Sequence, residues 1–267
     1  MDIGEALQQE LSDVASEIAE AARVVTLRYF RNSALAVDNK ETKGFDPVTI
    51  ADREAEQAMR DVLARKRPDD AIFGEEFGRT KGSSGLTWLL DPIDGTRAFI
   101  SGAPSWGVLI GLDAGHGPVL GIIDQPFTGE RFSGGFGKAI WERGGERRGI
   151  SVRACEGLEN SILMTTFPEV GTAKERAAFE AVSGQCRLTR YGLDCYAYAL
   201  LAMGQVDLVI EAGLNAYDVQ GPIGVVQGAG GIVTDWQGNP AHEGGQIIAA
   251  GDERAHAQAL ELLNVVG

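Results

Sequence analysis

Cysteine, histidine and long hydrophobic runs are all scarce in this sequence of 267 residues. The three cysteines, Cys155, Cys186 and Cys195, are odd in number and form no C-x-x-C pair, which argues against a disulfide framework or a zinc ribbon. The three histidines are scattered without a two-His ligand spacing, so a histidine-based zinc site has no support. Since no G-x-S-x-G elbow occurs either, the sequence also gives no support to serine-hydrolase chemistry.

Runs of basic residues are absent as well. The formal net charge is −14, whereas a nucleic-acid-binding surface needs a basic stripe that displaces counterions, so we expect no nucleic-acid partner. No apolar run reaches the length of a membrane span, and the acidic N-terminus lacks the apolar core of a signal peptide, which predicts a cytoplasmic protein without membrane contact. An acidic protein that handles phosphates needs metal ions to offset repulsion, or a substrate with its own cationic group.

Hydrophobic periodicity predicts one α/β (α+β) domain of two lobes over 1–267. An amphipathic helix is expected at 5–30, a second one between Thr49 and Pro68, and a meander of antiparallel strands at 106–141. These elements form a predicted N-terminal lobe, residues 1–145, and the C-terminal α/β lobe covers 146–267. The elements expected after residue 159 are a strand at 160–166, helices at 172–182 and 194–203, a strand at 206–211, a helix at 218–228, strands at 231–235 and 246–250, and a helix at 252–264.

The stretch Trp88–Phe99, W-L-L-D-P-I-D-G-T-R-A-F, carries the densest chemical signal. Its apolar start predicts a short buried strand, and Pro92 predicts a turn directly after that strand, because proline cannot donate to a central sheet ladder. We therefore expect the acidic residues of this stretch to lie in a turn.

Two carboxylates in that turn predict a site for a hard cation. Asp91 and Asp94 lie on either side of the Ile93 carbonyl, and Gly95-Thr96 can begin a helix whose free N–H groups favour an anion. Hard oxygen ligands beside an anion site suggest Mg²⁺-assisted phosphate chemistry. An ordinary Asp-Gly hairpin turn explains the same residues, so this stretch alone leaves both interpretations open.

Three further acidic residues stand next to apolar elements, and each has an ordinary structural explanation. Asp52 has capping-box spacing to Thr49. Glu75 follows an apolar strand in a loop that is expected to be solvated, and Asp218 stands at the start of a helix that it can cap. Singly, none of them selects a ligand role over a structural one.

Taken together, four motifs resemble, in order and spacing, the inositol monophosphatase family of Mg²⁺-dependent, lithium-sensitive phosphatases. They are D-P-V-T-I-A-D at 46–52, G-E-E at 74–76, D-P-I-D-G-T at 91–96 and Y-D-V-Q-G at 217–221. The resemblance spans essentially the whole chain. It implies a layered α-β-α-β-α sandwich, a homodimer, two or three Mg²⁺ ions per site that Mn²⁺ can replace, and hydrolysis of a small-molecule phosphate monoester without a covalent phosphoenzyme.

The resemblance also implies a role for each matching residue. The implied metal ligands are Glu75, Asp91, the Ile93 carbonyl, Asp94 and Asp218. The implied catalytic residues are Glu75, Thr96 and Asp52, with Thr96 and Asp52 as the pair that orients and deprotonates the attacking water. Gly95 and Thr96 supply backbone N–H groups to the phosphate, and Lys43 stands close to the flap lysine of the family.

Several residues are more similar to the histidinol-phosphate phosphatase branch of this family. Arg97 begins R-A-F-I-S-G, where inositol phosphatases typically have Asn before the Phe, and Asp194 falls where they carry a small residue. Glu211 matches their substrate-binding glutamate. Because two carboxylates suit an ammonium and an imidazole better than a neutral polyol, we expect hydrolysis of L-histidinol phosphate in histidine biosynthesis. An inositol-1-phosphate phosphatase, a broad sugar-phosphate phosphatase and a partner-binding regulatory protein are the alternatives.

Overall fold

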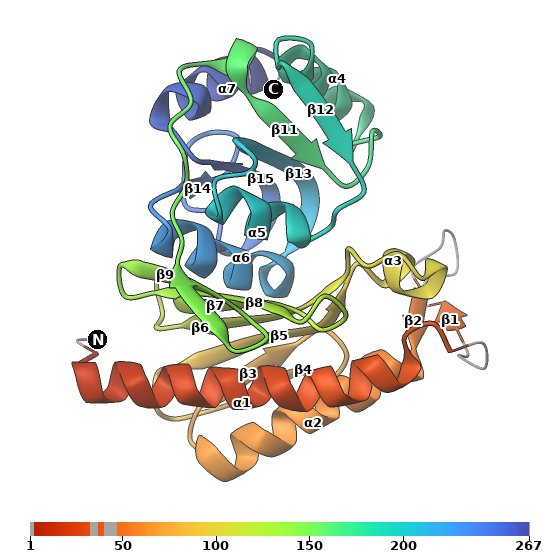
Figure 1. The fold of residues 1–267 in the computed structure, drawn as a ribbon, viewed down its shortest axis with the longest axis vertical. Coiled ribbons are helices and arrows are strands. Elements are labelled where there is room, and N and C mark those ends of the chain that lie inside the picture. Colours follow the sequence, from red (N-terminus) through yellow and green to blue (C-terminus); the bar gives the residue numbers. More distant parts are fainter. Residues whose placement is uncertain (1–2, 33–36, 40–46, 267) are drawn as a thin grey trace.

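The computed structural model describes residues 3–32, 37–39 and 47–266, and it stacks helices and sheets in five layers (Figure 1). Helices α1 (Glu5–Tyr29) and α2 (Ile50–Lys66) cover the outer face of an eight-stranded sheet. Helices α5 (Tyr196–Ala202) and α6 (Ala216–Gly228) separate that sheet from a five-stranded one. Helices α4 (Ala173–Ser183) and α7 (Glu253–Val266) close the other side, so the α-β-α-β-α sandwich predicted by the resemblance is confirmed.

Local sequence explains both helices of the outer layer. Helix α1 buries an apolar stripe at three- and four-residue spacing, with Leu11, Ile18 and Ala22 fully buried. Helix α2 starts at the predicted capping box, in which Thr49 and Asp52 exchange side-chain and backbone hydrogen bonds. It ends at Lys66, ahead of Pro68 as expected.

The eight-stranded sheet has the order β10-β9-β8-β7-β6-β5-β3-β4, and all neighbours are antiparallel except β3 and β5. A small sheet of β1 and β2 lies apart from it. The bounds of these ten strands are β1 Val37–Asn39, β2 Pro47–Thr49, β3 Ala71–Gly74, β4 Gly78–Thr80, β5 Thr87–Asp94, β6 Gly107–Asp113, β7 Pro118–Gln125, β8 Glu130–Gly135, β9 Lys138–Arg143 and β10 Glu146–Gly149.

The turn predicted at Pro92 is wrong, because β5 continues through this residue to Asp94. The pairing of β5 with β6 shifts register between Asp91 and Asp94, which forms a bulge. Pro92 lies inside the bulge, where the missing N–H breaks no regular ladder. The Ile93 N–H instead donates to the Asp91 carboxylate at 3.0 Å.

The five-stranded sheet has the order β12-β11-β13-β15-β14, with β11 parallel to both β12 and β13. Its strands are β11 Ile162–Thr165, β12 Leu188–Tyr191, β13 Leu208–Asn215, β14 Ile232–Thr234 and β15 Gly244–Ala250. Residues 150–157 cross from the first sheet to this one, and a short 3₁₀ helix, η1 (Leu158–Asn160), leads into β11 (Figure 1). The crossing segment is tied to the end of α6, since the Val152 N–H donates to the Ala229 carbonyl at 3.0 Å.

Helix α6 packs on β6, β7 and β8 through glycines on both sides of the contact. A Cβ atom added at Gly121 of β7 would meet the Gly221 carbonyl oxygen of α6 at 2.1 Å, and one added at Gly134 of β8 would meet the Val225 Cα at 2.3 Å. The absence of side chains therefore lets the helix backbone lie directly on the sheet. In the described residues, no helix combines the length and hydropathy of a membrane span.

Candidate active site

One cavity of 310 Å³ collects most of the residues that the sequence marks as functional. It lies where β3, β5, α3 (Thr96–Ser101) and the first turn of α6 meet residues of the second sheet. The predicted site residues that line it are Glu75, Asp91, Ile93, Asp94, Gly95, Thr96, Arg97, Asp194, Glu211 and Asp218.

Parallel strands bring the first acids together. Because β3 and β5 run parallel, their carboxyl ends reach the same edge of the sheet. The Glu75 N–H, directly after β3, donates to the Leu90 carbonyl at 3.1 Å, which fixes Glu75 beside the neighbouring Asp91. The bulge in β5 then lets both Asp91 and Asp94 face the cavity although they are three residues apart.

Helix α6 brings the fourth acid, Asp218. It begins at Ala216, two residues earlier than predicted, and Asn215 rather than Asp218 is its N-cap. Asp218 is the third helical residue and completes a capping box, accepting the Asn215 N–H at 2.6 Å. Asp218 therefore stabilises the start of α6 and lines the cavity at the same time.

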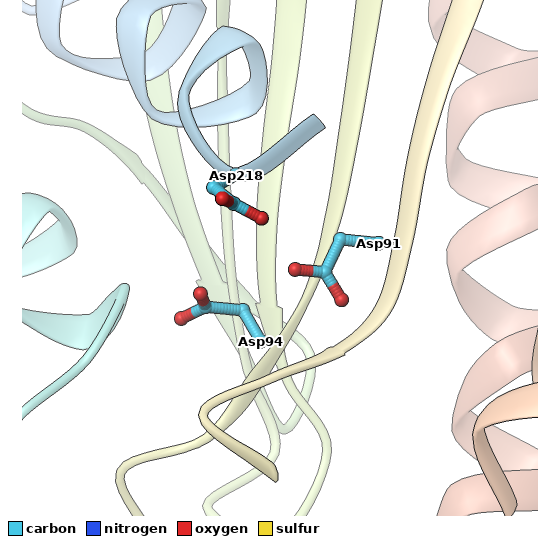
Figure 2. Close-up of side chains that lie close together, drawn as sticks. All are labelled: Asp91, Asp94 and Asp218. Carbon is cyan, nitrogen blue, oxygen red and sulfur yellow. The ribbon is translucent and has the colours of Figure 1, made fainter. Parts of the chain in front are cut away.

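The side chains of Asp91, Asp94 and Asp218 lie close together (Figure 2). One carboxylate oxygen from each lies within 4.8 Å of the other two. Burial, reinforced by the charges of neighbouring acids, raises the pKa of Asp91 and Asp94 well above the ordinary value and that of Asp218 to about 7. Three mutually repelling hard oxygen donors, one buried and two half-buried, suit a divalent cation, which would supply the positive charge that the cluster needs.

The turn after β5 brings the backbone of Gly95 close to Asp194. Gly95 has φ 81°, in the left-handed region, and a Cβ at this position would lie 2.8 Å from the Asp194 Cγ. As predicted, a short helix begins at Thr96. The Thr96 hydroxyl donates to the Ile93 carbonyl at 3.2 Å, and Asp94 accepts the Cys195 N–H at 2.7 Å.

Asp52 lies outside the set that lines the cavity. It is buried, and its carboxylate accepts the backbone N–H and the hydroxyl of Thr49 at 2.8 and 2.6 Å. Burial, with smaller contributions from Glu75 and Glu76, raises its pKa to about 7. In the part of the chain that the structure describes, no hydrogen bond joins Asp52 to Thr96, so their catalytic pairing stays a prediction. The other prediction for this region, Lys43, lies outside the described residues.

Two further carboxylates line the cavity from other elements. Asp194 adopts a left-handed φ of 47°, accepts the Ser105 hydroxyl at 2.9 Å and has a pKa raised by burial. Glu211 of β13 accepts the N–H and hydroxyl of Thr166 at 2.7 and 2.8 Å, and burial raises its pKa to about 7. Both side chains are thus held in place by hydrogen bonds, while burial disfavours their negative charge.

The structure adds residues that the sequence reasoning did not assign. Phe167 lines the cavity, and the Arg97 guanidinium carbon lies 5.1 Å from the centroid of its ring. Tyr198 also lines it, and the hydroxyl of this buried residue has no hydrogen-bond partner among the described residues. Tyr198 ends the segment Y-G-L-D-C-Y-A-Y at 191–198, which resembles the histidinol-phosphate phosphatase branch, whereas nothing local marked Phe167.

The fold and this carboxylate-lined cavity define a phosphatase of layered α/β architecture. The model of the inositol monophosphatase family matches residues 7–266, and the chain belongs to this family.

Individual relatives point to more than one substrate. The bifunctional phosphatase IMPL2, chloroplastic, of Arabidopsis thaliana is 42% identical over 261 residues, 94% of this chain and 74% of the relative. A histidinol-phosphatase of Chlorobaculum parvum is 33% identical over 258 residues, 95% of each chain. The solved structure of an inositol monophosphatase from Zymomonas mobilis has a TM-score of 0.83 at 41% identity and covers 94% of this chain and 96% of that chain.

Proposed function

We propose that this chain is a Mg²⁺-dependent phosphatase that converts L-histidinol phosphate and water to L-histidinol and phosphate in histidine biosynthesis. The observation that carries the proposal is a pair of carboxylates, the half-buried Asp194 and the buried Glu211, in the same cavity as the acid cluster of Asp91, Asp94 and Asp218. An ammonium supplies positive charge and N–H donors to such carboxylates, and an imidazole supplies a further N–H donor, whereas the hydroxyls of a polyol supply no charge. The relatives named histidinol-phosphatase support the same substrate.

The acid cluster would hold the metal in this proposal. Its ligands would be Asp91, Asp94 and Asp218, with Glu75 and the Ile93 carbonyl beside them. When bound, Mg²⁺ supplies Lewis-acid activation of water and neutralises charge on the phosphate.

The remaining proposed roles belong to the chain itself. Thr96 and Asp52, together with Glu75, orient the attacking water and accept its proton, while the Gly95 and Thr96 N–H groups bind the phosphate. The proposal also includes two or three ions per site, a homodimer and a cytoplasmic location. It divides the chain into two lobes between residues 145 and 146.

Steady-state phosphate release tests the substrate directly. With Mg²⁺, we expect kcat/KM for L-histidinol phosphate to exceed that for inositol 1-phosphate by at least about tenfold, which corresponds to one charge-assisted hydrogen bond. The opposite preference would select the inositol phosphatase alternative, which the Zymomonas mobilis structure favours. No hydrolysis across a panel of phosphate monoesters would instead favour a partner-binding protein.

The contact proposed for Asp194 can be tested by Asp194→Asn, which keeps an acceptor for the Ser105 hydroxyl. Loss of a charge-assisted hydrogen bond should raise KM for histidinol phosphate by roughly 10- to 100-fold. The KM for inositol 1-phosphate should not rise. An unchanged KM for histidinol phosphate would refute the contact.

A further inference from the structure

Phe167 is an aromatic side chain that the fold leaves open at the cavity. Its side chain is 44% exposed although it lines the cavity together with Asp194 and Glu211. A half-exposed phenyl ring keeps apolar surface in contact with water, and that surface becomes available to a ligand.

Hydrogen bonds fix the backbone just before Phe167 next to the Glu211 carboxylate. Thr166, the preceding residue, gives both its N–H and its hydroxyl to the Glu211 carboxylate at 2.7 and 2.8 Å. The Thr165 hydroxyl donates to the other oxygen of Glu211 at 3.2 Å. The segment after β11 therefore supplies an aromatic residue to the cavity in which Glu211 of β13 supplies an acceptor, and this combination recognises a flat ring bearing an N–H group.

The position of Arg97 shows what kind of group the ring accommodates. Its planar guanidinium carbon lies 5.1 Å from the Phe167 centroid, so a flat nitrogenous group already packs there. A positive guanidinium at this place favours a neutral imidazole over an imidazolium, because like charges repel. A neutral imidazole can still donate its N–H to Glu211 while the substrate ammonium pairs with Asp194.

We propose that Phe167 is a specificity-determining residue whose ring packs against the imidazole ring of the substrate, beside Arg97. This inference rests on the proposed function. It assigns the preference for a flat ring to Phe167 and leaves recognition of the amine to the carboxylates. An inositol ring bears an oxygen on every carbon and presents less apolar surface to a phenyl face, so it should gain less from Phe167.

Kinetics of Phe167→Leu and Phe167→Tyr on three substrates test this assignment. The substrates are L-histidinol phosphate, phosphoethanolamine, which has the amine without the ring, and inositol 1-phosphate. Phe167→Leu should lower kcat/KM for histidinol phosphate about tenfold, mainly through KM, the size of one aromatic contact. The other two substrates should change less than about twofold, and Phe167→Tyr should retain the parent values because it keeps the ring.

Phe127 provides a matched control. It is 45% exposed and lies under a guanidinium, with the Arg31 Cζ 4.4 Å from its centroid, but it does not line the cavity. Phe127→Leu should leave all three substrates unchanged, and thermal unfolding of both leucine variants checks that they fold.

Two results would overturn the inference while leaving the proposed function intact. One is an unchanged kcat/KM for histidinol phosphate in Phe167→Leu, and the other is an equal loss on all three substrates. By contrast, a parent enzyme that does not prefer histidinol phosphate would refute the proposed function itself and, with it, this role of Phe167.

Discussion

Asp94 is a residue whose charge is unfavourable for the metal-free fold and needed for the proposed chemistry. Burial and the charges of Asp194 and Asp218 raise its pKa well above the ordinary value. Asp94→Asn keeps an acceptor for the Cys195 N–H, so we expect a folded protein with unchanged or higher stability in chelator. Its phosphate release with Mg²⁺ should fall on the order of 10³-fold, since several kcal/mol of charge stabilisation are lost.

Assays of activity and thermal unfolding on the same samples check this prediction. Asp61→Asn, at an exposed position on α2, serves as the control and should match the parent in both assays. Wild-type activity in Asp94→Asn would show that the acid cluster is not the catalytic centre.

Glu211 predicts a pH dependence of stability in the metal-free protein. Burial raises its folded pKa to about 7, above its ordinary value, so the folded state holds a proton that the unfolded state releases between about pH 4 and 7. The stability of the parent therefore falls as pH rises through this range. Glu211→Gln cannot ionise, so at pH 8 it should exceed the parent by up to about 3 kcal/mol, and this advantage should vanish near pH 4.

Urea unfolding in chelator at pH 4.5 and pH 8 measures the difference. Gln keeps a carbonyl acceptor for Thr166, and its amide faces a Thr165 hydroxyl that can accept as well as donate. An equal stability difference at the two pH values would mean that Glu211 is not the titrating group.

Single residues that combine a local pattern with a chemical type could be predicted from the sequence. Asp52 and Asp218 were expected as helix-start acids, and both do complete capping boxes. Phe167 carried no such pattern, because an aromatic side chain at a cavity has the same local sequence as one in the core. Only the tertiary fold distinguishes an exposed ring from a buried one.

Among the elements, the long periodic helices were predicted well, whereas the strand with a β-bulge and the short exposed strands were not. Helix α1 was expected at 5–30 and spans Glu5–Tyr29. By contrast, β5 was expected to stop at Pro92 and runs to Asp94, because the bulge that absorbs proline depends on the pairing with β6. The short edge strands β10 and β12 were missed, since their residues are mostly exposed and show little hydrophobic pattern.

The close glycine contact between α6 and the eight-stranded sheet predicts that the position of α6 determines the geometry of the acid cluster. Gly121→Ala would place a Cβ 2.1 Å from the Gly221 carbonyl oxygen, so the helix must move away from β7. Overpacking of this kind costs roughly 1–3 kcal/mol. Because Asp218 stands three residues before Gly221 on α6, we also expect weaker Mg²⁺ binding.

Calorimetric titration with Mg²⁺ and thermal unfolding measure both effects. Gly149→Ala on β10 is the matched control, because its Cβ would meet nothing closer than the Ala139 carbonyl oxygen at 4.0 Å, and its stability should change by less than about 0.5 kcal/mol. If Gly121→Ala lost stability but bound Mg²⁺ as the parent does, α6 would not set the geometry of the acid cluster.

At the scale of the whole molecule, the site is a product of topology. Asp91 and Asp94 belong to the eight-stranded sheet, Asp218 to the helix between the sheets and Glu211 to the five-stranded sheet. The α/β class followed from periodicity, but the strand order did not, because pairing depends on contacts between residues far apart in the sequence. The order of the motifs along the chain resembles that of the family, and this resemblance predicted that these residues form one site.

Binding of Mg²⁺ across these elements should stabilise the whole fold in a pH-dependent manner. An ion that binds only the folded state adds about 2.7 kcal/mol at 100 times its Kd, which for a chain of this length raises Tm by roughly 5 to 10 °C. Its ligands must be deprotonated, and the Asp218 pKa of about 7 means that a proton competes below that pH. The Tm increase should therefore be full at pH 8 and clearly smaller at pH 5.5 for the same Mg²⁺ concentration. Scanning fluorimetry of the parent and Asp94→Asn measures this, and an equal increase at both pH values, or in both proteins, would place the ion elsewhere.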